Sequence, residues 1–504
     1  MNRRTYIAIL FLGVALAYTL CFVFAGFGNH QDPLYWLYKY STLEGGWMAT
    51  GTLLTGGAIV RLFVAQLLPL RLAGWLCVVT AIALPYCCLQ TQEQRRANLP
   101  WLALTYIFMG YGAFQEFSPG TLSVLLLSAL WVTQSPVVLG LAIAARFPNI
   151  LALLVLIPLW KKSSLWKIPI AALSAGLIYL LGYFFITPSP MDAAMTSHDL
   201  LPMLTKLWSH GGTMILYALM TVGVLAIGKS FHHSIIPSFI VGALLLLVAI
   251  YTIKPTQWYN TDLTYMLSAM ILVISLGNLK SQILNHKFEI LIGAIILMIA
   301  TLGTDTAWLK LFPAVLCLLP LAAVQYEAPI RRYLFTVLVI FSLVVIYRMS
   351  TNSVGRTNLT QVQTISSVAP YQHIAIHPAE EHRLQQFCAD YDSLYTIHHT
   401  PYTVLAVGQE NHLIRAVTGC QAARFNEFWS NIYDSVYTAK YREIIRTERP
   451  VVFCSFSPQF KTKPAYRDKE SAFERMLLDE GYQALDRSTY KYMIYIPNYG
   501  TEIR

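Results

Sequence analysis

The feature that most constrains this chain is a succession of apolar runs that fills its first 347 residues. Typical runs are Thr5–Phe27, Ile168–Ile186 and Tyr333–Tyr347, separated by short polar breaks. A helix that crosses a bilayer needs about 20 mostly apolar residues, and several of these runs reach or approach that length. Thr5–Phe27 is also too long for the apolar core of a signal peptide. This part is therefore predicted to be a polytopic transmembrane helical bundle, mainly α in class.

From Arg348 onward the sequence has the charge density of a soluble protein, although only 12% of the whole chain is charged. We therefore predict two domains, residues 1–348 in the membrane and residues 349–504 as a small soluble α/β domain. The patterns that indicate strands and helices cover Tyr402–Val407, Val451–Phe456, an edge strand at Tyr490–Pro497, and helices at Ala379–Tyr391, Asn426–Arg446 and Lys469–Gly481. Because no catalytic motif stands out there, we interpret this domain as a lid or substrate-shaping domain.

The distribution of basic residues fixes the expected topology. Fourteen apolar runs can be counted, but fourteen crossings would place three basic pairs on the side opposite Arg3-Arg4. If Met48–Leu70 lies on the outer surface instead, about thirteen crossings remain and every basic pair falls on the cytoplasmic side, as the positive-inside rule requires. Met48–Leu70 is also a poor span, since it contains several glycines, Arg61 and Pro69.

This topology places the N-terminus in the cytoplasm and the C-terminal domain outside, which fits a bacterial inner membrane. The outer face then carries the loop 28–70, short breaks between helices and the C-terminal domain. The net charge of +10 follows from basic residues in the breaks between apolar runs, so a nucleic-acid partner is not expected.

Three acids are expected near this outer face: Asp32, Glu44 and Glu116. A carboxylate there can accept a proton from a hydroxyl nucleophile or help to hold a divalent cation such as Mg²⁺ or Mn²⁺. The alternative for Asp32 is a helix cap with Pro33 at the first helical position. The alternative for Glu116 is a polar turn before Pro119.

Arg146 lies within an apolar stretch, where an ionisable side chain is costly and therefore a functional hypothesis. Its guanidinium could bind a lipid phosphate through two parallel hydrogen bonds. The alternative is an arginine at a hairpin tip whose head group reaches the surface. His198 and Asp305 are further polar groups of the outer face that could contact a substrate, although His198 is more simply a solvated loop residue.

The combined pattern resembles the GT-C superfamily of membrane glycosyltransferases. The likeness rests on Asp32 after the first helix, Pro69-Leu70-Arg71-Leu72 at the second crossing, Glu116 before Ser-Pro-Gly, Arg146-Phe-Pro-Asn and Gly303-Thr-Asp305. It implies that Asp32 is the catalytic base, Glu116 the second outer acid and Arg146 a contact to the donor phosphate, with Arg71 and Asp305 also at the substrate. The chain departs from the family in the segment after Asp32, which leaves Glu44 as an alternative base.

The function expected from this resemblance is transfer of a hexosyl or pentosyl unit from a polyprenyl-phosphate or polyprenyl-diphosphate donor to an acceptor hydroxyl, with inversion, in envelope glycan or glycoprotein synthesis. The acceptor is a glycan, a lipid or a protein. The alternatives are a polysaccharide flippase and a non-catalytic assembly protein. A transporter usually shows internal repeats and ionisable groups at mid-bilayer; here no repeat is seen and most polar groups gather at one surface.

Overall fold

The structure is a computed structural model. In it the chain forms two compact units. It describes residues 3–25, 31–63, 66–110, 116–160, 164–188, 200–231, 240–241, 244, 261–277, 289–302, 307–322, 326–351, 364–398, 403–408, 411–418, 435–455, 464–487 and 492–498. The first unit holds residues 1–26, 39–64 and 68–361, and the second holds 27–38, 65–67 and 362–504. The longest part of the second unit thus begins at residue 362, and parts of the loop 28–70 belong to this unit.

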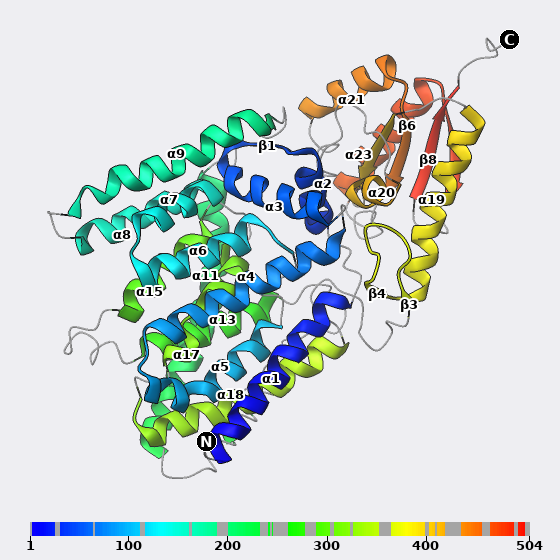
Figure 1. Ribbon diagram of the computed structural model, residues 1–504. Helices are drawn as coiled ribbons and strands as arrows, with labels where there is room; N and C mark the ends of the chain where they lie inside the picture. Colours follow the sequence, from blue (N-terminus) through cyan, green and yellow to red (C-terminus); the bar gives the residue numbers. More distant parts are fainter. Residues whose placement is uncertain are drawn as a thin grey trace. The chain divides into compact units, whose positions relative to one another are not determined.

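The first unit is almost entirely helical (Figure 1). Its elements up to the first short strand pair are α1 Arg3–Phe24, α2 Gln31–Thr42 (shared with the second unit), β1 Glu44–Gly45, η1 Trp47–Ala49, α3 Thr50–Leu62, α4 Leu67–Cys88, α5 Gln92–Met109, α6 Pro119–Thr133, α7 Pro136–Ala145, η2 Phe147–Leu151, α8 Ala152–Leu159, α9 Lys167–Phe185 and β2 Thr187–Pro188. They are followed by α11 Leu200–Phe231, α13 Thr261–Leu276, α15 Glu289–Met298, η4 Ile299–Thr301, α16 Ala307–Leu316, α17 Leu319–Ala322 and α18 Ala328–Thr351.

Four of the described helices are long and apolar enough to cross a membrane: Thr5–Phe24, Leu67–Cys88, Lys167–Phe185 and Ala328–Tyr347. Seven shorter apolar helices accompany them. Helix length and composition therefore support an integral membrane protein, while the count of thirteen crossings stays a prediction. The 13 residues of α3 extend about 20 Å, which is short of the bilayer core of about 30 Å. This length is consistent with the expectation that Met48–Leu70 does not cross.

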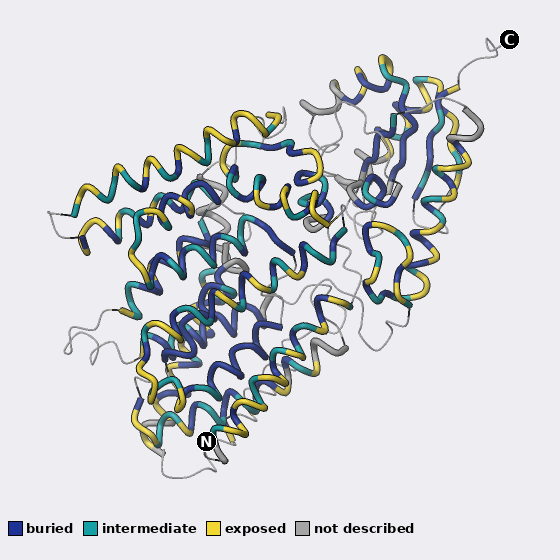
Figure 2. Tube along the Cα trace, in the orientation of Figure 1, coloured by how far each residue is buried: buried dark blue, intermediate teal, exposed yellow. Residues whose placement is uncertain are grey.

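The exposed surface of α9 is apolar, as a lipid-facing helix requires. Leu173, Tyr183 and Phe184 are 65%, 82% and 70% exposed, and Figure 2 shows yellow along much of this helix. Its opposite face packs on α7. A Cβ on Gly140 of α7 would lie 2.5 Å from the carbonyl oxygen of Ala171 in α9, so the close approach of these helices requires glycine there.

The second unit contains a four-stranded sheet in the order β5-β6-β8-β7. Its elements are β3 Thr364–Ile365, β4 Ala375–Ile376, α19 Pro378–His398, β5 Val404–Gly408, α20 Asn411–Thr418, α21 Ser435–Thr447, β6 Val451–Ser455, α23 Pro464–Asp479, β7 Tyr482–Arg487 and β8 Tyr492–Pro497. β5 and β6 are parallel, whereas β8 is antiparallel to β6 and to β7. Figure 2 shows β6 and β8 dark blue, which marks them as the core of the sheet.

The sequence predicted β5, β6, β8 and three helices of this unit but gave β8 the wrong place in the sheet; of the predicted helix Asn426–Arg446, residues 426–434 lie outside the described residues. Tyr490–Pro497 was expected at the edge, yet β8 lies between β6 and β7. The edges are β5 and β7, and the β7 sequence Tyr-Gln-Ala-Leu-Asp-Arg has no apolar run that would indicate a strand. The expected glycine stop of the last helix is confirmed, since Gly481 has a φ of 78° just after α23.

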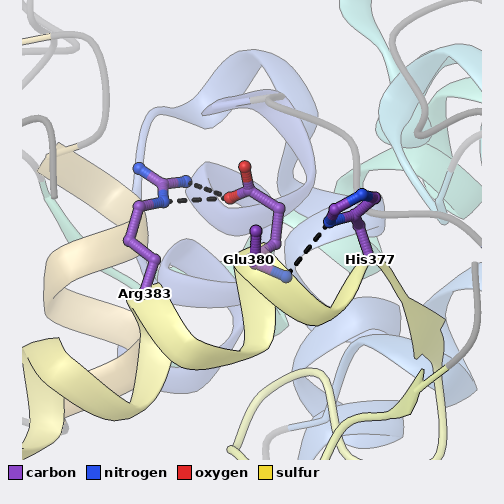
Figure 3. A network of polar contacts seen from close by, with 4 residues as sticks. His377, Glu380 and Arg383 are labelled. Carbon is purple, nitrogen blue, oxygen red and sulfur yellow. Dashed lines mark hydrogen bonds and ion pairs between the residues drawn. The ribbon is translucent and has the colours of Figure 1, made fainter. Parts of the chain in front are cut away.

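The beginning of α19 is held by a local polar network (Figure 3). His377 Nδ1 accepts a hydrogen bond from the Ala379 amide at 3.1 Å. Arg383 donates from Nε to Glu380 Oε2 at 2.9 Å, and its Nη2 lies 2.8 Å from the same oxygen. These contacts satisfy helix-end amides and place negative charge at the helix N-terminus, where it is stabilising. We read this network as structural support.

Candidate functional site

The turn that carries Glu116 is packed against the first turns of α4. The Phe117 amide donates a hydrogen bond to the carbonyl oxygen of Leu70 at 2.8 Å. A Cβ on Gly74 would lie 2.5 Å from both the carbonyl carbon and the carbonyl oxygen of Glu116. Because a side chain at position 74 would collide with this backbone, the turn can approach α4 only where the helix has glycine.

The end of α2 joins the same turn. Tyr40 is fully buried, and its hydroxyl donates to the Phe117 carbonyl oxygen at 3.0 Å. α3 packs behind the Tyr40 ring, since a Cβ on Gly56 would lie 2.4 Å from it. Phe117 is therefore bonded through its amide to α4 and through its carbonyl to α2. We call the meeting point of α2, α4 and the turn 116–118 the Phe117 junction.

Three charged residues adjoin the Phe117 junction in sequence and are buried. Lys39, Arg71 and Glu116 are 1%, 4% and 5% exposed, and each is next in sequence to a residue that forms the junction. Charged side chains are rarely buried unless they interact with polar or charged groups, and each of these three has further interactions. Two of the three side chains are cationic and one is a carboxylate.

Two of the predicted site residues, Arg71 and Glu116, thus lie at one junction. Lys39 was not singled out from the sequence, because it stands in the aromatic segment Tyr35–Tyr40, which was read only as part of an outer loop. Leu34 and Leu37 are buried, and their three-residue spacing indicates a helix. On such a helix Lys39 lies nearly opposite their stripe, so the apolar spacing does not indicate its burial.

Asp32 is the second residue of α2. It lies within the first helical turn, and the capping alternative stays a prediction. Only its backbone is described. Positions 32 and 39 are two turns apart, which is about 10 Å along the axis, and they share one face of α2.

Glu44, the alternative base, has a different setting. It is partly buried in β1, which pairs in parallel with β2 through the register Glu44 to Thr187. The Thr187 amide also donates to the Leu43 carbonyl oxygen at 2.9 Å. Glu44 therefore lies beside the end of α9, at the start of the segment that leads to residue 198. His198 itself lies outside the described residues.

Arg146 stands between α7 and η2 and donates to the end of η4. Its Nη1 bonds the Ala300 carbonyl oxygen at 2.5 Å, and its Nη2 bonds the Leu302 carbonyl oxygen. A cation is stabilising at a helix C-terminus, where carbonyl groups lack partners. Asp305, three residues after Leu302, lies outside the described residues. Arg146 thus fixes the point from which the predicted Gly303–Asp305 segment starts, and its contact to a phosphate stays a prediction.

The donor set at the Phe117 junction does not suit a divalent cation. Mg²⁺ and Mn²⁺ are held by several oxygen ligands, and among Lys39, Arg71 and Glu116 only Glu116 offers such ligands. Within the described ranges, no three His, Cys, Asp or Glu side chains gather as metal ligands. We therefore assign no metal-dependent step to this junction.

Among the solved structures that match this chain are two states of one protein. Both align over 98% of this chain and 98% of the other. One is ArnT from Cupriavidus metallidurans in the apo state, with 10% identity and a TM-score of 0.38; the second is the same ArnT bound to undecaprenyl phosphate, with 11% identity and a TM-score of 0.32. No family model matches the chain, and neither does any curated protein sequence. Likeness at this level carries no functional conclusion, which must come from the site.

Proposed function

We propose that this chain is a membrane glycosyltransferase of the GT-C type that uses a polyprenyl-phosphate or polyprenyl-diphosphate sugar. The observation that carries the proposal is the burial of Lys39, Arg71 and Glu116, each next in sequence to a residue of the Phe117 junction. Arg71 in the second turn of the apolar helix α4 and Lys39 of α2 suit a lipid phosphate, whose polyprenyl chain then extends along the apolar helices. Arginine provides bidentate contacts to phosphate, and lysine adds a compact charge.

Asp32 is the proposed base. The acceptor oxygen attacks the anomeric carbon and forms the new glycosidic bond, while the acceptor proton passes to the Asp32 carboxylate. The bond between the anomeric carbon and the phosphate oxygen breaks, and its electron pair stays on that oxygen. Lys39 and Arg71 stabilise the charge that develops there. Attack from the face opposite the leaving phosphate inverts the anomeric configuration.

Glu116 is assigned to the donor end of the site. It is 5% exposed, and the Phe117 amide next to it is hydrogen-bonded to the turn of α4 that carries Arg71.

The reaction can be tested with the purified protein in liposomes that contain polyprenyl-phosphate sugars and an acceptor mixture from the bacterial envelope. The proposal predicts release of polyprenyl phosphate together with a glycosylated acceptor. Movement of the intact donor between leaflets without cleavage would identify a flippase and overturn the proposal. Binding of envelope proteins with neither cleavage nor movement would identify an assembly protein.

A further inference from the structure

Two parts of the loop 28–70 belong to the second unit, residues 27–38 and 65–67. At one end, the Gln66 side chain donates from Nε2 to Gln372 Oε1 at 2.8 Å, and the Leu67 amide donates to the Pro370 carbonyl oxygen at 3.1 Å. At the other end, residues 27–38, which include Asp32, belong to the same compact unit as the C-terminal domain. The proposed base therefore lies on a segment that packs with the C-terminal domain.

One side-chain contact anchors this segment. The guanidinium carbon of Arg415 lies 3.6 Å from the centroid of the Tyr38 ring. Arg415 is only 5% exposed, so this cation–π contact is largely shielded from water, which strengthens it. The planar guanidinium can stack on the ring in a way that a lysine ammonium cannot.

Arg415, which makes this contact, lies on a well-packed helix of the second unit. Arg415 belongs to α20, which follows β5 and packs against β5, β6 and α19. Ile414 beside it is fully buried, as are Val404 and Leu405 of β5. On the other side of the contact, Leu34 and Leu37 of α2 are buried too. Movement of the Tyr38 ring is therefore coupled to the sheet on one side and to α2 on the other.

We propose that Arg415 is a positioning residue for Asp32 and acts through Tyr38. Asp32 precedes Tyr38 by six residues in a continuous helix, so the direction of α2 set at Tyr38 also sets the place of Asp32. Contacts within the second unit then set the geometry of the proposed base. This inference rests on the proposed function, in which Asp32 is the base.

The test compares Arg415→Ala and Tyr38→Leu with the conservative variants Arg415→Lys and Tyr38→Phe in the full-length protein. We expect the first two to lower kcat at least tenfold and to change the KM for the lipid donor less than twofold. Tyr38→Phe keeps the ring and should retain more than half of kcat. Arg415→Lys keeps the charge without the planar stack and should fall between. Arg446→Ala is the matched control, because Arg446 is an exposed arginine of the same unit paired with Glu480 at 2.7 Å.

A second readout does not depend on turnover. Hydrogen exchange of the amides in residues 34–38 should become faster in Arg415→Ala and stay unchanged in Arg446→Ala. If Asp32→Asn is inactive while Arg415→Ala and Tyr38→Leu keep wild-type kcat, the positioning role is wrong and the proposed function stands. If Asp32→Asn keeps full activity, the proposed base is wrong. A raised donor KM at unchanged kcat in Arg415→Ala would overturn the positioning role by marking Arg415 as a substrate ligand.

Discussion

The Phe117 amide donates a hydrogen bond to the Leu70 carbonyl oxygen at 2.8 Å, which places Glu116 beside the helical turn that carries Arg71. Two predicted site residues, 45 positions apart in the chain, are thereby brought to one junction. The contact is possible because Gly74 leaves space for the backbone of Glu116.

Substituting Gly74 should disrupt this junction. A Cβ there would lie 2.5 Å from the Glu116 backbone, so Gly74→Ala must displace the turn, and we expect transfer activity to fall at least tenfold. Gly176→Ala in α9 is the matched control, since a Cβ at Gly176 has nothing within 4 Å. Alanine is also the better helix former by about 1 kcal/mol. Equal activities of the two variants in the transfer assay would contradict the close packing.

Loss of a buried cation should weaken donor binding. Lys39→Met keeps the length of the side chain and removes its charge, and we expect the KM for the lipid donor to rise about 10- to 100-fold, equivalent to about 1.4–2.8 kcal/mol. Lys167→Met, at the start of α9, serves as the control because Lys167 lies over the Trp160 ring, away from the Phe117 junction. An unchanged donor KM in Lys39→Met, with the protein folded, would argue against phosphate binding by Lys39.

Arg146 should contribute mainly to stability. Arg146→Ala leaves the carbonyl groups of Ala300 and Leu302 without their donors, which we expect to cost about 1–3 kcal/mol. Thermal unfolding in detergent measures this loss, with the exposed Arg61 of α3 replaced by alanine as the control. A stable Arg146→Ala protein with a raised donor KM would instead support the predicted contact to phosphate.

The pH dependence of the second unit should reflect Glu381. Burial acts to raise the pKa of this carboxyl, but hydrogen bonds from Ser366, Ser367 and Gln385 outweigh it, so its pKa lies below the ordinary value of 4.5. The stability that these bonds provide is fully present above pH 4.5 and is lost as the pH falls through the lowered pKa of the folded state. Pulse proteolysis of residues 364–398 in the full-length protein should show a smaller loss of stability with acid in Glu381→Gln than in the wild type.

The topology can be checked with reporters fused at the N-terminus and at Gln94. Both should report the cytoplasmic side, because only α4 is expected to return the chain after α1, with α3 remaining on the outer surface. Reporters on opposite sides would mean that α3 crosses, and the outer position of Glu116 would then be wrong.

The helices of the first unit and their order could be predicted from the sequence, because apolar runs separated by polar breaks indicate helices in a bilayer. The same holds for β5 and β6, whose short apolar runs mark buried strands. β7 could not be found in this way, because it has no apolar run and carries polar residues such as Gln483 and Asp486. The central place of β8 depends on pairing between segments, which local patterns do not contain.

The candidate site was only partly predictable for a similar reason. Glu116 and Arg71 could be proposed because a charged residue next to an apolar run is conspicuous. Lys39 was missed because no local pattern in the sequence indicates that this lysine of α2 is buried. The anchoring of Tyr38 by Arg415 joins residues 377 positions apart, and no periodicity in the chain indicates it.

The most direct test of the central claim is sugar transfer by the carboxylate series Asp32→Asn, Glu44→Gln and Glu116→Gln in liposomes with a polyprenyl-phosphate sugar. We predict that Asp32→Asn abolishes kcat, that Glu116→Gln lowers activity mainly through the donor KM, and that Glu44→Gln stays within about threefold of the wild type. Wild-type transfer by all three variants would contradict a carboxylate base at this site.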